Sequence, residues 1–187
     1  AGSGDGRCQR RRGHVRGWPG REGTTVGAPG SAALYRVCGE AVEQHGDRGA
    51  VTPPGATALV PRGPLGVVGV VVPWSYPLEI AAWERAAGLA AGNAVVLKPS
   101  ERDPSVPVRI AELFLEAGLP AGVLNVVHGD KEAVDALLTD DRIRAVGFVG
   151  STPIAEYIYA TAAAHGKRAQ CFGGAKNHTI GLPDADL

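Results

Sequence analysis

The sequence has 187 residues, enough for one domain and part of a second. Hydrophobic residues make up 44% of the chain and charged residues 20%, so a sizeable core can form. The 19 basic and 19 acidic residues cancel, which excludes a global field that attracts polyanions, and no apolar run reaches the roughly 18 residues that a membrane span needs.

Residues 1–64 have a composition of their own. They hold nine arginines, no lysine and five acidic residues, a local charge of +4, and 14 of the 27 glycines. Only Ser31–Gln44 has helical character, and the Gly and Pro punctuation predicts coil elsewhere. A basic nucleic-acid arm is the alternative, but only Trp18 and Tyr35 are available for stacking on bases. We therefore expect a poorly ordered or non-homologous segment and no nucleic-acid partner.

From residue 65 onward, predicted strands and helices alternate, and the local charge is −4. The predicted strands are Leu65–Val72, Ala94–Leu97, Val123–Val127, Ala145–Val149, Ala169–Phe172 and Thr179–Leu182. The predicted helices are Leu78–Ala91, Ser105–Ala117, a short helix capped by Asp130, and a helix capped by Ser151 with Ile154, Tyr157 and Ile158 on its inner face. Strict alternation predicts an α/β fold with a doubly wound parallel sheet over residues 65–187.

The strand Ala94–Leu97 ends in a cation, a proline and a carboxylate. In an open α/β sheet, ligands bind beyond the carboxyl ends of the strands. Lys98 can hold an anion there, and Glu101 can accept hydrogen bonds from sugar hydroxyls. A solvated surface ion pair is the alternative reading of this segment alone.

Three further strand ends carry residues of interest. Gly150 and Ser151 follow a predicted strand and open a helix, where free N–H groups bind phosphate, although Ser151 is also an ordinary N-cap and no GxGxxG motif occurs. Val72 precedes a turn in which two prolines fix the chain and Trp74 offers an apolar face. Gly173 and Gly174 permit either a close approach to a ligand or a tight turn.

Cysteine usage indicates the compartment. Cys8, Cys38 and Cys171 are odd in number and far apart, and no Cys/His cluster occurs, so neither a disulfide framework nor a metal site is expected. Together with the lack of an apolar leader segment, this favours a reducing, cytoplasmic location.

Several motifs occur together in a recognisable order. The segments VVPWSYPLEIAAWERAAGLAAGNAVVLKPSE, ELFLEAGLPAGVLNVVHGD, AVGFVGST and CFGGAKNH resemble the NAD-binding, Rossmann-like domain of the aldehyde dehydrogenase superfamily. Details such as KPSERDPS and GGAKNH are similar to the CoA-acylating methylmalonate-semialdehyde dehydrogenase branch. The resemblance covers Pro64–Leu187, and earlier residues show no match, which leaves a diverged remnant or a misread reading frame as alternatives for residues 1–64.

The resemblance implies a role for each matching position. Lys98 and Glu101, assisted by Arg102, would hold the adenosine ribose of NAD, and Ser151 would bind the pyrophosphate. In the same comparison, Val72 would contribute backbone, Trp74 would border the cofactor, and Gly173 would approach the nicotinamide. A cysteine thiolate of the family attacks the aldehyde, hydride passes to the nicotinamide, and the thioester is released to CoA or water.

The sequence departs from the family pattern at two chemical positions. The nucleophilic cysteine of the family lies beyond Leu187, and Cys171 stands where hydrolytic members carry a general-base Glu, so we expect an inert Cys171 and transfer to CoA. Ser75 replaces the Asn that donates to the oxyanion, and loss of one such donor typically costs about 2.7–4 kcal/mol.

These implications define the expected activity. The complete protein would oxidise methylmalonate or malonate semialdehyde to an acyl-CoA with NAD and CoA, as a homo-oligomer without a membrane partner. The chain would be an incomplete NAD-binding domain that is inactive by itself. The alternative is a non-catalytic nucleotide-binding fragment or regulatory module.

Overall fold

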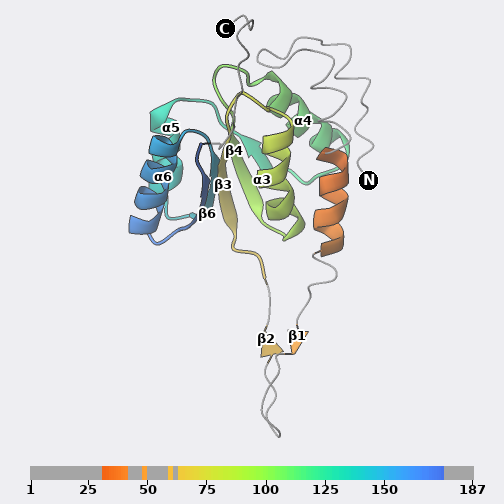
Figure 1. Ribbon diagram of the computed structural model, residues 1–187. Coiled ribbons are helices and arrows are strands. Elements are labelled where there is room, and N and C mark those ends of the chain that lie inside the picture. Colours follow the sequence, from red (N-terminus) through yellow and green to blue (C-terminus); the bar gives the residue numbers. More distant parts are fainter. Residues whose placement is uncertain (1–30, 42–47, 50–58, 61–62, 175–187) are drawn as a thin grey trace, which may run out of the picture.

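The computed structural model describes residues 31–41, 48–49, 59–60 and 63–174 (Figure 1). Its main feature is a parallel sheet of β3 (Val67–Val71), β4 (Ala94–Lys98), β5 (Leu124–Val126), β6 (Ile143–Val149) and β7 (Arg168–Phe172). The strands lie in the order β5-β4-β3-β6-β7, and every neighbouring pair is parallel. The predicted fold class, a doubly wound parallel α/β sheet, is confirmed.

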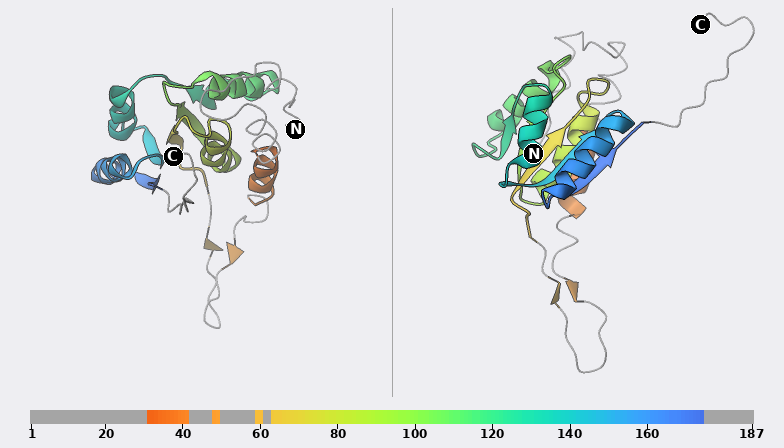
Figure 2. Two further views of the ribbon diagram at one scale, coloured as in Figure 1. Left: turned by 45° about the horizontal axis from the view of Figure 1, so that its top comes forward. Right: turned by 90° about the vertical axis from the view of Figure 1, so that its left-hand side faces the viewer.

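Helices cover both faces of this sheet (Figures 1 and 2). One layer contains α3 (Glu79–Ala90) and α4 (Ser105–Glu116), which contact β3, β4 and β5. The other contains α5 (Lys131–Thr139) and α6 (Thr152–Ala164), which contact β3, β6 and β7. Because a parallel sheet is covered on both faces, its central strands are apolar almost throughout, which is why β3 reads VVGVV.

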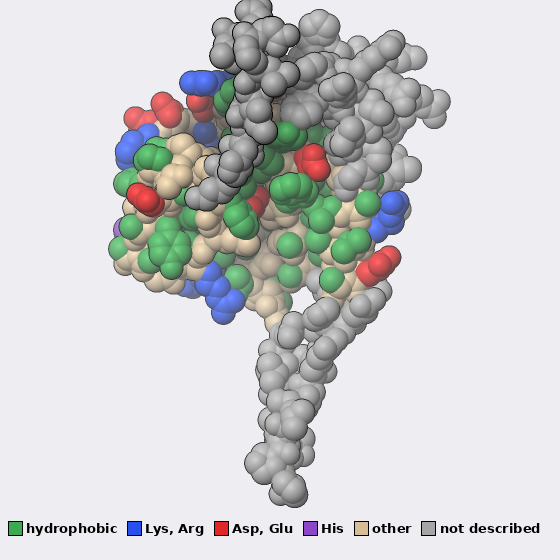
Figure 3. Space-filling view, viewed as in Figure 1, with side chains coloured by type: hydrophobic (Ala, Val, Ile, Leu, Met, Phe, Trp, Pro, Cys, Tyr) green, Lys and Arg blue, Asp and Glu red, His purple; other side chains and the backbone are tan. Residues whose placement is uncertain are grey.

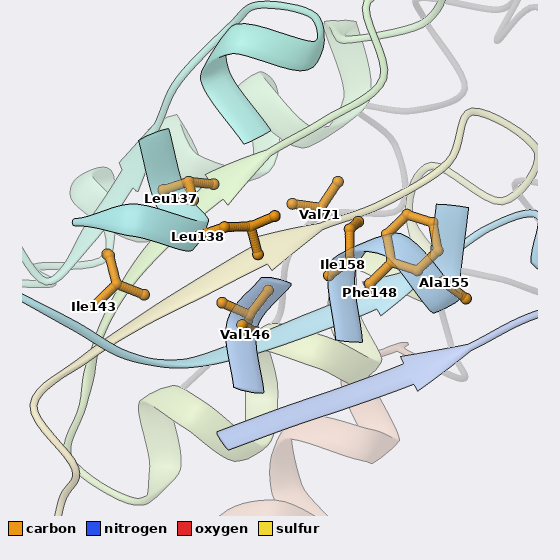
Figure 4. Close-up of a cluster of buried hydrophobic side chains, with 9 residues drawn as sticks. Val71, Leu137, Leu138, Ile143, Val146, Phe148, Ala155 and Ile158 are labelled. Atoms are coloured by element: carbon orange, nitrogen blue, oxygen red, sulfur yellow. The ribbon is translucent and has the colours of Figure 1, made fainter. Parts of the chain in front are cut away.

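A hydrophobic core lies on each face. The cluster under α5 and α6 is drawn in Figure 4 and includes Leu138, Ile158 and Ala162, all 0% exposed. The cluster under α3 and α4 includes Val70, Val95 and Leu97, which are equally buried. Burying a Val or Leu side chain fully contributes about 1.5–3 kcal/mol, so these two clusters hold the strands in register.

The predicted element bounds differ from the observed ones by no more than two residues over the described part of the chain. The helices α3 and α4 end as expected at glycines with left-handed backbone, Gly92 with φ +80° and Gly118 with φ +93°. The predicted strand Thr179–Leu182 lies outside the described residues.

The predicted inner face of α6 was wrong for two of its three residues. Ile154 is 49% exposed and Tyr157 is 39% exposed, whereas Ala155, Ile158 and Ala162 are buried. The small alanines bring α6 close to the sheet, and the Tyr157 hydroxyl donates to Asp135 Oδ1 of α5 at 2.8 Å. A polar interaction with the neighbouring helix therefore decides which way Tyr157 points.

Part of the N-terminal segment also packs against this domain. The helical character expected for Ser31–Gln44 corresponds to a helix over residues 31–41, and residues 1–30 lie outside the described part. Tyr35 makes an edge-on ring contact with Phe114 of α4 at 5.3 Å between centroids, and its hydroxyl accepts a hydrogen bond from Arg85 of α3. Two short strands, β1 (Arg48–Gly49) and β2 (Leu59–Val60), pair antiparallel apart from the main sheet (Figure 1). The proposed division at residues 64/65 stays a prediction.

Candidate functional site

The strand order reverses at β3, so a ligand site is expected at the carboxyl ends of β4, β3 and β6. From β3 the chain crosses to β4 and β5 on one side and later returns to β6 and β7 on the other. In open α/β sheets, ligands bind where the loops after two neighbouring strands lead to opposite faces, and here the loops after β3 and β6 lead to α3 and α6 on opposite faces. Since neighbouring strands are about 4.8 Å apart, the ends of β4 and β6 are separated by about 10 Å.

Lys98, the last residue of β4, forms the ion pair on which the prediction rests. Its side chain is 7% exposed, and Nζ lies 3.2 Å from Glu101 Oε2, whose side chain is 55% exposed. Hydrogen bonds from its own backbone N–H and from the Lys98 ammonium lower the pKa of Glu101. The strand end thus holds a buried cation that presents an ionised carboxylate to solvent.

The loop after Glu101 is organised by short side chains. The backbone N–H of Arg102, an exposed residue, donates to Ser100 Oγ at 3.3 Å. Asp103 is 6% exposed, its Oδ1 accepts from Ser105 Oγ at 3.1 Å, and its Oδ2 has no hydrogen-bond partner. Burial raises the pKa of Asp103. Sequence reasoning missed Asp103, whose local signal is its place two residues before Ser105, whose hydroxyl can donate to it.

The end of β3 joins this region through the backbone. Val72 is 3% exposed, and its N–H donates to the carbonyl of Lys98 at 3.2 Å, so β3 and β4 stay paired one residue beyond the ladder. In the loop that follows, Trp74 is 38% exposed and Ser75 is half-buried. Because the side chain of Val72 is buried, only its backbone is available to a ligand.

The N-terminus of α6 has the properties of an anion site. Ser151 is the N-cap residue with φ −70° and ψ 149°, but its exposed side chain makes no capping hydrogen bond. Its carbonyl accepts from Ala155 N–H at 2.9 Å, Pro153 lies in the first turn, and no acidic residue does. The hydroxyl of Ser151 and the first N–H groups of the helix are therefore free to bind an anion.

The Gly173–Gly174 turn after β7 contacts this helix end. The N–H of Gly174 donates to Thr152 Oγ1 at 2.9 Å, and the N–H of Gly150 donates to the carbonyl of Phe172 at 3.0 Å. A side chain at Gly173 would meet Thr152 Oγ1 at 3.0 Å. The glycine thus permits a close approach between the turn and α6, a role that the sequence could not separate from ligand contact.

A carboxylate that the sequence reasoning missed lies on the α3 face of the sheet. Glu84 of α3 is half-buried over Gly147 of β6, and burial raises its pKa to about 7. Cys171 packs against the core cluster under α5 and α6. Its pKa is raised mainly by burial and to a lesser extent by the charge of Glu84. A raised pKa favours the neutral thiol, as expected for an unreactive cysteine. In the sequence, the signal for Glu84 is an acidic residue in a helix between Ala82 and Arg85, which are both buried. The strand that it faces carries a glycine, Gly147.

Within the described residues, neither the distribution of charge nor the placement of metal-binding side chains identifies a further site. On the face seen in Figure 3, basic and acidic side chains are interspersed around the hydrophobic surface instead of gathering by sign. Within the part of the chain that the structure describes, no three His, Cys, Asp or Glu residues are placed to hold a metal ion. No helix in that part combines the length and apolar character needed to cross a membrane.

The fold and the residues at its switch point define a doubly wound α/β domain with a cationic strand end, an exposed carboxylate and a free helix N-terminus at one edge. The chain belongs to the aldehyde dehydrogenase family, whose sequence model matches residues 17–187. This match begins upstream of Pro64, the first residue of the motif resemblance.

Individual relatives agree with the branch that the motifs indicate. The chain is 60% identical over 124 residues to malonate-semialdehyde dehydrogenase of Pseudomonas aeruginosa, covering 66% of this chain and 25% of that protein. It is 57% identical over 126 residues to malonate-semialdehyde dehydrogenase 2 of Geobacillus thermodenitrificans, covering 67% of this chain and 26% of that protein. The chain thus spans about a quarter of the length of the curated relatives that it matches.

Solved structures extend the likeness to three dimensions. Methylmalonate-semialdehyde dehydrogenase from Oceanimonas doudoroffii superposes with a TM-score of 0.79 at 48% identity, over 84% of this chain and 32% of that one. A candidate methylmalonate-semialdehyde dehydrogenase from Sinorhizobium meliloti 1021, solved with NAD, gives 0.78 at 51% identity, over 87% and 33% of the two chains. The resemblance to this branch of the family is confirmed.

Proposed function

We propose that the chain supplies the NAD-binding part of an enzyme that oxidises malonate or methylmalonate semialdehyde to an acyl-CoA. The observation that carries this proposal is the Lys98–Glu101 pair at the end of β4, two strands away from the free N-terminus of α6. The names of the relatives and the NAD in the Sinorhizobium meliloti structure support it.

The residues at the switch point fit the chemical parts of NAD. The ionised carboxylate of Glu101 is exposed and can accept from ribose hydroxyls, while Lys98 orients it and Arg102 lies beside it. The unused hydroxyl of Ser151 and the N–H groups of α6 can hold the pyrophosphate. The nicotinamide end would then lie near Trp74, the backbone of Val72 and Gly173. When bound, NAD supplies the hydride acceptor for aldehyde oxidation.

The remaining chemistry of the complete protein follows from two positions. Ser75 lies half-buried after β3 and would be the oxyanion donor, with a shorter reach than Asn. Cys171 is half-buried and stands where hydrolytic members of the family carry a general-base Glu. The lack of that carboxylate favours transfer of the acyl group to CoA over hydrolysis. The nucleophilic cysteine would come from another part of the protein, and homo-oligomerisation and a cytoplasmic location are further expectations for it.

Calorimetric titration of the 187-residue chain with NAD tests the cofactor site. The wild-type chain should bind NAD, and Lys98→Met should weaken binding about tenfold, because a charged hydrogen bond contributes about 1.5–3 kcal/mol. Lys131→Met, which removes an exposed lysine paired with Asp135 of α5, is the matched control and should bind normally. Wild-type affinity in Lys98→Met, or no binding by the wild type, would contradict the proposal.

A non-catalytic nucleotide-binding module is the second candidate function. The raised pKa of Cys171 leaves that thiol a poor nucleophile, which agrees with this candidate and with the enzyme alike. Both candidates predict NAD binding without turnover by this chain, so they separate in the complete protein, where only the enzyme reduces NAD when given malonate semialdehyde and CoA. NAD-linked aldehyde oxidation by the 187-residue chain alone would contradict both.

A further inference from the structure

Thr152, the first residue of α6, makes a contact that neither the motifs nor the proposed function uses. Its Oγ1 accepts a hydrogen bond from the N–H of Gly174 at 2.9 Å, across 22 residues of sequence. Its neighbour Ser151 makes no capping hydrogen bond. The two adjacent hydroxyls therefore differ in their roles: one is free for a ligand and the other is engaged by the turn after β7.

The backbone around this hydrogen bond is tightly constrained. A Cβ at Gly173 would lie 3.0 Å from Thr152 Oγ1 and 3.2 Å from Thr152 Cα, closer than ordinary van der Waals contact. On the other side of Thr152, the N–H of Gly150 donates to the carbonyl of Phe172 at 3.0 Å. The start of α6 and the Gly173–Gly174 turn are thus joined by one hydrogen bond and a glycine-dependent contact, and a second hydrogen bond holds the ends of β6 and β7 together next to them.

We propose that Thr152 is a positioning residue that couples the phosphate-binding end of α6 to the Gly173–Gly174 turn, and so sets where the nicotinamide end of NAD lies relative to the pyrophosphate. The inference rests on the proposed function. Threonine suits the task because its β-branched side chain has restricted χ1 rotamers, which holds Oγ1 toward the turn. Its backbone N–H stays available at the helix N-terminus, so the two roles of α6 do not compete.

Two ligands separate this role from a general effect on the site. NAD carries the nicotinamide, whereas ADP-ribose contains the adenosine, the pyrophosphate and the second ribose but no nicotinamide. If Thr152 acts through the turn, its loss should affect NAD alone. A defect in the pyrophosphate site should affect both ligands equally.

The experiment uses the 187-residue chain and calorimetric titration with NAD and with ADP-ribose. Thr152→Val keeps the branched shape and removes the acceptor, and should weaken NAD binding about three- to tenfold while ADP-ribose binding stays within twofold. Thr152→Ser retains Oγ1 and should restore at least half of the lost NAD affinity. Because Thr152 and Gly174 are exposed, water can replace the lost bond, and the urea midpoint of Thr152→Val should match that of the wild type.

The outcomes separate a failure of the proposed function from a failure of the role given to Thr152. If the wild-type chain binds neither ligand, the proposed function fails, and the inference fails with it. If the wild type binds both but Thr152→Val leaves NAD affinity unchanged or weakens both ligands equally, only the inference is overturned. Equal affinity of the wild type for NAD and ADP-ribose would also overturn it, since the turn would then contribute nothing to binding.

Discussion

The carboxylate of Glu84 occupies the space that a side chain at position 147 would need. Glu84 extends from the middle of α3, and a Cβ at Gly147 of β6 would collide with its Oε2. The glycine lets a half-buried carboxylate rest on the sheet, where burial raises its pKa to about 7. The pair explains why β6, which is apolar except for Arg144, contains a glycine, and it predicts that the stability of the domain depends on pH.

Glu84→Gln should stabilise the domain at alkaline pH. The pKa of Glu84 in the folded state, about 7, is above its ordinary value of 4.5, so the folded state binds the proton more tightly than the unfolded state. The cost of the buried charge appears as pH rises from 4.5 and is complete above 7. The variant should gain about 2 kcal/mol in free energy of unfolding at pH 8 and little at pH 5. Urea unfolding at both pH values measures this.

The exposed Glu156 of α6 provides the control for this experiment. Glu156→Gln keeps the same chemical change on a solvated helix face and should shift stability by less than about 0.5 kcal/mol at either pH. An equal gain for Glu84→Gln at pH 5 and pH 8 would contradict the assignment of the effect to ionisation of Glu84.

Gly147→Ala should destabilise the domain through Glu84. The added methyl group forces the carboxylate to move, and overpacking of this kind costs about 1–3 kcal/mol, with the lower end expected because the displaced atoms end a flexible side chain. In the Glu84→Ala background the same substitution should cost much less. A double-mutant cycle from thermal or urea unfolding gives the coupling energy, and a value near zero would mean that the two residues do not share this space.

Glu101→Gln should reduce discrimination between NAD and NADP. In the proposed site, the ionised carboxylate of Glu101 would accept hydrogen bonds from the ribose hydroxyls of NAD and would repel the 2′-phosphate of NADP. The variant should bind NAD several-fold more weakly, and the ratio of the two dissociation constants should fall by about tenfold. Calorimetry with both cofactors is the measurement, and Glu112→Gln on the exposed face of α4 is the control. An unchanged ratio would place the 2′ position away from Glu101.

Asn93→Ala should lower stability more than Asn125→Ala at an exposed position. The buried side chain of Asn93 accepts from the N–H groups of Leu65 (2.6 Å) and Gly66 (3.1 Å), and donates to the carbonyl of Gly88 (2.9 Å). Removing it leaves the N–H groups of Leu65 and Gly66 without this acceptor, while the Gly88 carbonyl keeps its bond from the Asn93 N–H (3.1 Å), at about 2–3 kcal/mol in total. Asn125→Ala loses a bond to the Gly122 carbonyl (2.8 Å) and a long one to the Val95 carbonyl (3.5 Å), both from an exposed side chain, and should cost less than about 1 kcal/mol. Urea denaturation that ranks the two variants the other way would contradict this account.

Much of the fold follows from local patterns. The apolar run at Val67–Val71 and the left-handed glycines Gly92 and Gly118 are short-range signals, and they placed β3, α3 and α4 to within two residues. The orientation of α6 was not a short-range property. Its apolar residues nearly encircle the helix, and contacts of Tyr157 with Asp135 and Lys131 of α5 decide which of them face solvent.

The candidate site divides in the same way. The sequence by itself determined that Lys98 and Glu101 end one strand and that Gly150 and Ser151 end another, because each pair belongs to a single strand–loop unit whose chemistry is local. Only the tertiary structure decided that the β3 strand between them makes a switch point, that Glu84 rests on Gly147, and that Thr152 receives Gly174. These contacts join residues 22 to 63 positions apart, and their geometry depends on how whole helices pack on the sheet.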